Sequence, residues 1–200
     1  MNPFIGKAAP DFTAKAVMPD NSISGEFNLK KYLKGHKGIL FFYPLDFTFV
    51  CPSEIISFNN RLGEFASRNT KIVGVSVDSH FSHYAWKSTP VNKGGIGNIQ
   101  FPLVSDLKKE IATAYNVLND DGVSYRATFL IDEHFHIRHY LINDLALGRD
   151  PEETGRLIDA IDHHNSNGEV CPAGWTKGQQ GMRPTQEGVS DYLTSNAERL

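Results

Sequence analysis

Cys51 and Cys171 are the only two cysteines in this chain of 200 residues, and a thiolate is a strong nucleophile. Two cysteines cannot form the dense disulfide framework of a small secreted domain, and a reducing cytosol disfavours a permanent bridge. The ordinary role of a lone cysteine is that of a small buried apolar side chain. The sequence around each thiol must therefore decide between packing and chemistry.

Cys51 lies where a loop meets a predicted helix. The continuous apolar run at residues 38–43 predicts a strand that is buried on both faces. Apolar residues then recur every three or four positions in residues 52–67, and Pro52 suits the first helical position, so this segment predicts an amphipathic helix. The free N–H groups and dipole at a helix N-terminus favour a thiolate, and the position of Cys51 therefore favours nucleophilic chemistry.

The residues before Cys51 form a specific motif. Residues 44–51 read PLDFTFVC and match the Pro-x-x-x-Thr-x-x-Cys signature of peroxiredoxins, which this chain resembles. The likeness extends over nearly the whole chain, through residues 76–79, 83–86, 94–97, 126–132 and 168–175. Within the peroxiredoxins the chain is most similar to the typical two-cysteine group, and in that group to the bacterial alkyl hydroperoxide reductase C type.

The resemblance implies a catalytic role for four residues, three in the motif and one far from it in sequence. Cys51 attacks the O–O bond of a hydroperoxide, and the hydroxyl of Thr48 forms a hydrogen bond with the peroxide. Arg126 stabilises the thiolate and the departing oxygen, while Pro44 shields the sulfur from water. These roles match a physical need, because the reaction requires aligned oxygens and a stabilised developing negative charge.

Glu54 and Arg149 match the supporting pair of the family, which would orient Arg126. The alternative for such a pair is an ordinary surface ion pair without a catalytic role. The sequence alone leaves this choice open.

Cys171 is the only candidate for the second thiol of the cycle. Attack on peroxide leaves Cys51 as a sulfenic acid, which another thiol condenses to a disulfide before further oxidation. The resemblance implies that Cys171 comes from the partner subunit of a head-to-tail dimer. We expect Val170 and Trp175 to pack this segment until it opens locally.

No metal and no organic cofactor are expected. Histidines cluster at residues 134–139 and at 163–164, but strand alternation separates members of the first group and the spacing matches no known ligand set. The Gly-Gly-Ile-Gly segment at residues 94–97 lacks the spacing of a phosphate loop or of a dinucleotide fingerprint.

The predicted fold is an α/β, thioredoxin-like domain with a central mixed sheet flanked by helices, over residues 1–164. Further strands are expected near residues 71–77, 102–105, 127–131 and 136–142, the last two as an antiparallel hairpin, with helices near 81–89 and 107–115 and from Pro151 onward. Residues 165–200 are rich in turn-forming residues at their start and predict a C-terminal arm that carries Cys171.

Charge and composition favour small-molecule or protein partners. The 20 basic and 23 acidic residues form no long blocks, which argues against nucleic acid or an anionic membrane as a partner. Residues 1–10 lack the features of a signal peptide and no apolar run approaches 18 residues, so a cytoplasmic location is expected.

The resemblance implies a thiol-dependent peroxidase that acts on hydrogen peroxide and alkyl hydroperoxides. Thioredoxin or a dedicated flavoprotein disulfide reductase would restore the thiols, and homodimers would assemble into a decamer. A thioredoxin-type exchanger is disfavoured because position 54 is glutamate, where a Cys-x-x-Cys motif needs cysteine. A second hypothesis is a chaperone-like oligomer that holds unfolded clients through exposed apolar surface.

Overall fold

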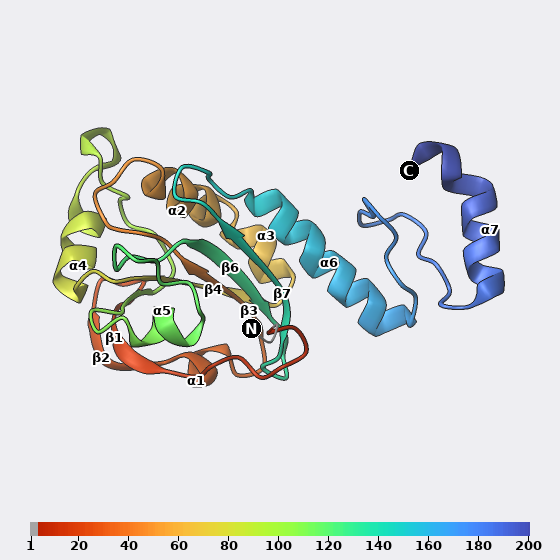
Figure 1. The fold of residues 1–200 in the computed structure, drawn as a ribbon. Coiled ribbons are helices and arrows are strands. Elements are labelled where there is room, and N and C mark those ends of the chain that lie inside the picture. The colour runs from red at the N-terminus through yellow and green to blue at the C-terminus, as the bar shows by residue number, and fades with distance from the viewer. Residues whose placement is uncertain (1–3) are drawn as a thin grey trace. The chain divides into compact units, whose positions relative to one another are not determined.

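A computed structural model describes residues 4–200 (Figure 1). The chain forms two compact units, the first ending at Pro151 and the second comprising Glu152–Leu200. The boundary predicted at residues 164 and 165 lies within helix α6 (Pro151–Asn167), at the start of the second unit, and the separation of domain and arm at that point stays a prediction.

The first unit is built on one seven-stranded sheet. Its strands are β1 (Thr13–Val17), β2 (Ile23–Asn28), β3 (Lys37–Phe42), β4 (Thr70–Ser76), β5 (Leu103–Ser105), β6 (Arg126–Ile131) and β7 (Ile137–Asn143), in the spatial order β2-β1-β5-β4-β3-β6-β7. The pairs β3–β4 and β4–β5 are parallel, and the other neighbours are antiparallel. The predicted mixed α/β sheet and the predicted hairpin, β6–β7, are confirmed.

Successive side chains of β3 point to opposite faces of the sheet, and both faces are buried, so the strand contributes to two cores. On one face the Phe42 ring packs against Tyr115, beside α5 (Glu110–Ala114), and α1 (Leu29–Leu33) completes this layer. On the other face the Phe41 ring stacks on Phe58 of α2 (Cys51–Asn60) at 4.9 Å, and Phe58 packs against Phe65 of α3 (Leu62–Ser67). Helices therefore cover both faces of the sheet (Figure 1).

The first unit differs from the predicted elements in three respects. The helix predicted at residues 52–67 is two helices, because the backbone leaves helical geometry at Arg61 (φ −103°, ψ 11°). The apolar face nevertheless continues across the break. Strands β1 and β2 and helix α1 were not predicted. Helix α4 (His80–Ser88) lies within one residue of the predicted helix, and a short 3-10 helix, η1 (Val91–Lys93), follows it.

The second unit begins with α6 and ends with α7 (Gln186–Asn196) and the 3-10 helix η2 (Ala197–Arg199). Between the helices the chain forms turns and one antiparallel bridge, in which Val170 and Met182 exchange two backbone hydrogen bonds of 2.9 Å. Residues 168–185 are thus loop and turn, as expected for most of this segment, but α6 runs to Asn167, past the predicted start of the loop at residue 165. Helix α7 was not predicted. No helix among the described residues is long and apolar enough to cross a membrane.

Candidate active site

Cys51 is the first residue of α2 and has no solvent-exposed surface. Strand β3 leads to this position, and Pro44, which cannot donate a ladder hydrogen bond, is buried just after the strand. The loop at residues 45–50 then reaches the helix, which begins one residue earlier than predicted and places Pro52 second. The sulfur accordingly lies at the N-terminal end of the helix dipole.

Two polar groups approach the Cys51 sulfur. Thr48 Oγ1 lies 2.9 Å from Cys51 Sγ and 2.8 Å from the Leu45 carbonyl oxygen. Because a hydroxyl has one proton and two lone pairs, Thr48 can donate to only one of these groups at a time. Arg126 Nη1 lies 3.3 Å from the same sulfur. The sulfur is therefore held between a hydroxyl that can exchange partners and a permanent cation.

Arg126 is held in place from two sides. Its Nη1 donates to Glu54 Oε2 at 2.7 Å and its Nε donates to the Leu145 carbonyl at 2.7 Å. The side chain comes from the first residue of β6 and is buried. A guanidinium that is fixed in this way costs little reorganisation when charge develops beside it.

Glu54 and Arg149 form a buried bidentate ion pair. Arg149 Nε donates to Glu54 Oε1 at 2.7 Å and Arg149 Nη2 donates to Oε2 at 2.9 Å, while Arg149 Nη1 also donates to the carbonyls of Phe42 and Ala127 at 2.7 Å. Glu54 is 3% exposed and Arg149 is 7% exposed. The alternative of a surface ion pair is therefore wrong, and the pair joins α2 to the centre of the sheet.

The carboxyl group of Glu54 is held in its charged form. Burial by itself raises the pKa of Glu54, but the hydrogen bonds and charge of Arg149, together with the charge of Arg126, outweigh burial and lower the pKa below its ordinary value. Two buried guanidiniums and one carboxylate carry one net positive charge. The Cys51 sulfur therefore lies beside a buried cluster of net positive charge, 3.3 Å from Arg126 Nη1.

A second buried network, which sequence reasoning did not assign, supports the loop. Asp46 accepts hydrogen bonds from Tyr43 Oη at 2.9 Å and from Ser82 Oγ at 2.7 Å, and its Oδ2 lies 2.8 Å from His83 Nδ1. His83 Nε2 lies 3.2 Å from the Val104 carbonyl, so both ring nitrogens face acceptors. His83 belongs to the matched segment at residues 83–86, which was the one available signal.

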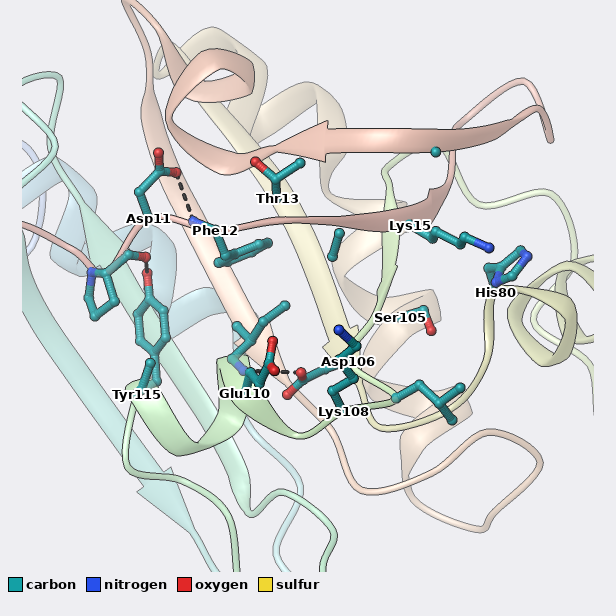
Figure 2. A pocket seen from close by; sticks show the side chains of 16 residues that line it. Asp11, Phe12, Thr13, Lys15, His80, Ser105, Asp106, Lys108, Glu110 and Tyr115 are labelled. Carbon is teal, nitrogen blue, oxygen red and sulfur yellow. Dashed lines mark hydrogen bonds between the residues drawn. The ribbon is translucent and has the colours of Figure 1, made fainter.

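A cavity of about 600 Å³ lies elsewhere in the first unit, between β1 and α5 (Figure 2). Its lining includes Phe12, Lys15, His80, Asp106, Ile111 and Tyr115, and none of the seven predicted site residues. This cavity therefore does not lie at the Cys51 thiol.

Cys171 lies in the second unit, directly after the bridge at Val170. Its sulfur is 3.4 Å from the carbonyl oxygen of Ala160 on α6. Burial raises the pKa of the Cys171 thiol, while the charge of Arg156 acts in the opposite direction and that of Glu169 adds to the rise. Both cysteines are free thiols.

The described part of the chain holds no group of three or more His, Cys, Asp or Glu side chains that could hold a metal ion. His134, His136 and His139 therefore form no such group, although they are close in sequence.

Comparison with known proteins agrees with this geometry. The AhpC/TSA family matches residues 5–140, and the C-terminal domain of 1-Cys peroxiredoxin matches residues 160–195. An alkyl hydroperoxide reductase C of Helicobacter pylori is 48% identical over 98% of this chain and 99% of its own length, and peroxiredoxin-1 of Gekko japonicus is 49% identical over 98% of each. The crystal structure of the reduced 2-Cys peroxiredoxin of Plasmodium vivax is 52% identical, with a TM-score of 0.93 over 96% of this chain and all of that one. This chain therefore belongs to the AhpC/TSA family, as a two-cysteine peroxiredoxin of the alkyl hydroperoxide reductase C type.

Proposed function

We propose that this peroxiredoxin reduces hydrogen peroxide and small alkyl hydroperoxides, with Cys51 as the attacking thiol. The observation that carries the proposal is the buried Cys51 sulfur, 2.9 Å from the Thr48 hydroxyl and 3.3 Å from the Arg126 guanidinium. Similarity to proteins named alkyl hydroperoxide reductase C supports the substrate class.

In the first step the Cys51 thiolate attacks the terminal oxygen of ROOH. An S–O bond forms, the O–O bond breaks, and the electron pair of that bond leaves with RO⁻, which takes a proton from solvent. Cys51 becomes a sulfenic acid. The Thr48 hydroxyl and the Arg126 guanidinium lie where they stabilise charge that moves from sulfur to the departing oxygen.

Three further residues complete this assignment. Glu54 and Arg149 hold Arg126 against the sulfur, because Glu54 accepts from both guanidiniums. Pro44, which is buried two residues after the end of β3, keeps bulk water from the thiolate. Removal of one preorganised hydrogen-bond donor from such a site typically lowers the rate by about 10²–10³-fold.

In the second step the Cys171 thiolate of a partner subunit attacks the Cys51 sulfenic acid. An S–S bond forms and hydroxide leaves, which becomes water. Thioredoxin or a flavoprotein disulfide reductase then supplies two electrons and restores both thiols. No step of this cycle requires a metal ion or an organic cofactor bound to this chain.

The assembly that we propose is a homodimer joined through β7, and a decamer of five dimers. Strand β7 lies at the edge of the sheet, and an edge strand offers unpaired backbone groups to a second copy. Leu141 and Ile142 on this strand are exposed apolar side chains. Sedimentation of the reduced protein tests this, with about ten subunits expected and a monomer at micromolar concentration contradicting it.

The chaperone-like alternative has one observation in its favour. Phe47, Phe49 and Phe81 are large exposed apolar side chains in the loop before α2 and on α4. Such surface can hold an unfolded client or another subunit. Light scattering measures aggregation of a heat-denatured client in the presence of wild type or of Cys51→Ser. Equal suppression of aggregation by both proteins would support a chaperone role, because that role does not need the thiol, whereas peroxide reduction does.

Peroxide turnover tests the proposed function. Consumption of hydrogen peroxide is measured with thioredoxin and its reductase, and then with a flavoprotein reductase. The wild type should turn over with at least one donor and Cys51→Ser with neither. We place the enzyme in the cytoplasm, where both thiols stay reduced between cycles, and fractionation of cells that produce the chain tests this location.

A further inference from the structure

The segment that carries Cys171 is attached to α6 by His163, a residue without a role in the steps above. His163 Nε2 lies 3.0 Å from Glu169 Oε2, and the His163 ring centroid lies 4.8 Å from that of Trp175. Glu169 precedes Cys171 by two residues and Trp175 follows it by four. One imidazole thus contacts the chain on both sides of the thiol.

The surroundings of His163 leave it little freedom. Its side chain is 20% exposed, and Asn167 Nδ2 lies 3.2 Å from its Nδ1. Gly181 closes a further side, because a Cβ atom there would lie 2.6 Å from His163 Nε2 and would also collide with Glu169. When Asn167 donates to Nδ1, the neutral ring carries its proton on Nε2 and donates it to Glu169.

Protonation of the ring changes the strength of this attachment. A second proton on Nδ1 removes the acceptor for Asn167, which keeps its hydrogen bond of 3.0 Å to the His163 carbonyl. The contact with Glu169, in which a neutral N–H donates to a carboxylate, then becomes an ion pair and gains the attraction between two opposite unit charges. The histidine side chain is the one whose charge ordinarily changes between pH 5 and 8.

Glu169 is the charged group that contacts the ring among the described residues. Asp162 and His164 flank His163 on α6, and His164 Nδ1 lies 2.8 Å from the Glu169 backbone carbonyl. Asp159 lies on α6 one turn before His163, and its Oδ1 is 3.8 Å from Lys177 Nζ. The side chain that faces the ring across the Glu169 contact is therefore acidic.

We propose that His163 is a positioning residue for disulfide formation, which holds the Cys171 segment on α6 more tightly when its imidazole is protonated. Acidification then slows the release of Cys171, and the Cys51 sulfenic acid persists longer and meets a second peroxide more often. This inference rests on the proposed peroxidase cycle.

Arg156 provides a matched control. Arg156 Nη1 donates to the Trp175 carbonyl at 2.7 Å, and its Nε and Nη2 donate to Glu153 at 2.6 and 2.7 Å. It therefore holds the same tryptophan as His163 does. A guanidinium stays protonated at every pH used, so its contribution to the attachment does not change with the charge of the side chain.

The test measures disulfide formation after one equivalent of hydrogen peroxide, by rapid quenching at pH 5.5 and pH 8, as the ratio of variant to wild type. Titration of the two thiols is common to wild type and His163→Gln and cancels in their ratio. Arg156→Gln removes a charge that lowers the pKa of Cys171, but burial raises that pKa, so the thiol is mostly protonated at both pH values and the effect is the same factor at each. His163→Gln, which keeps an amide donor but cannot be charged, should be about fivefold faster than wild type at pH 5.5 and within twofold of it at pH 8. Arg156→Gln should differ from wild type by the same factor at both pH values.

A ratio for His163→Gln that is equal at both pH values would overturn the inference. His163→Phe, which keeps the ring on Trp175, guards against a general loss of structure and should show the same pH-dependent ratio as His163→Gln. Dimedone labelling of the Cys51 sulfenic acid in Cys171→Ser tests the peroxidase step separately. Labelling without a pH-dependent ratio refutes the role of His163 alone, and loss of labelling refutes the proposed function.

A second readout needs no peroxide. A protonated imidazole in contact with an indole quenches its fluorescence, and His163 lies against Trp175. The fluorescence of the reduced Cys51→Ser protein should fall between pH 8 and pH 5.5, and this fall should be absent when His163→Gln is added. An identical fall in both proteins would show that the ring does not gain a proton against Trp175.

Discussion

The Thr48 hydroxyl oxygen lies 2.9 Å from the Cys51 sulfur, three residues along the chain. The same hydroxyl lies 2.8 Å from the Leu45 carbonyl, so it can donate to the carbonyl in one state and to an incoming oxygen in another. The geometry of the loop before α2 thus places a reversible donor at the reacting atom.

Thr48→Val should lower kcat/KM for hydrogen peroxide by about 10²–10³-fold, because it removes this donor and keeps the shape of the side chain. Thr48→Ser is the matched control and should stay within about tenfold of the wild type, since it keeps the hydroxyl. Stopped-flow peroxide consumption with a recycling system gives both values. Equal losses in the two variants would show that the hydroxyl is not the active part.

Arg126→Gln should slow the reaction of Cys51 with peroxide and its alkylation by iodoacetamide at pH 7. The variant loses the cation that lies 3.3 Å from the sulfur, while Glu54 keeps its bidentate partner Arg149. Alkylation of Cys171 in the same protein is the internal control, because it lies in the other unit. Peptide mass spectrometry after timed quenching measures both thiols, and unchanged alkylation of Cys51 would remove Arg126 from the site.

Glu54→Gln should lower the free energy of unfolding by about 3–5 kcal/mol at pH 7, because two buried guanidiniums lose their carboxylate. Urea denaturation measures this change, with the exposed Glu26→Gln as a control that should alter it by less than about 0.5 kcal/mol. A loss for Glu54→Gln as small as that of the control would contradict the buried ion pair.

The stabilisation by Glu54 should also depend on pH. Its folded-state pKa is lowered, so the stabilising contribution is fully present above the unfolded value of about 4.3 and is lost as the pH falls through the folded value. The difference between wild type and Glu54→Gln should therefore be constant from pH 8 to about pH 5 and shrink below about pH 4. A difference that stays constant on acidification would contradict the lowered pKa.

The local sequence was sufficient for the elements that pack on both faces of the sheet. Strand β3 contains a continuous apolar run and β4 is rich in β-branched residues, and nearly all positions of both strands are buried. Strands β1 and β2 were not predicted because exposed and buried positions alternate irregularly in them and their pairing contains a register shift near Ala14 and Ala16. Their structure comes from tertiary pairing, which a local window does not contain.

Some residues of the candidate site could be predicted from the sequence, and others could be recognised only in the folded chain. The motif at residues 44–51 indicated Thr48 and Cys51 because they are close in sequence. The Tyr43–Asp46–His83 network was not predicted, because His83 lies 37 residues after Asp46 and the sequence near Asp46 does not indicate His83 as its partner. The choice between a surface and a buried Glu54–Arg149 pair depended on burial, which only the folded chain provides.

Cys171→Ser should keep one oxidation event per subunit and lose recycling by thioredoxin, because the sulfenic acid no longer has a resolving thiol. Oxidised wild type should run as a disulfide-linked dimer on non-reducing gels, and Cys171→Ser as a monomer. Monomeric bands for the oxidised wild type would exclude an intersubunit bridge.

The attack of the buried Cys51 sulfur on peroxide is tested most directly in the reduced Cys171→Ser protein, mixed with one equivalent of hydrogen peroxide and then with dimedone. Mass spectrometry of the Cys51 peptide should show close to one dimedone adduct per subunit, and the peroxide should be consumed in the same proportion. Consumption of peroxide without an adduct on Cys51, or no consumption at all, would contradict the assignment of this sulfur as the attacking atom.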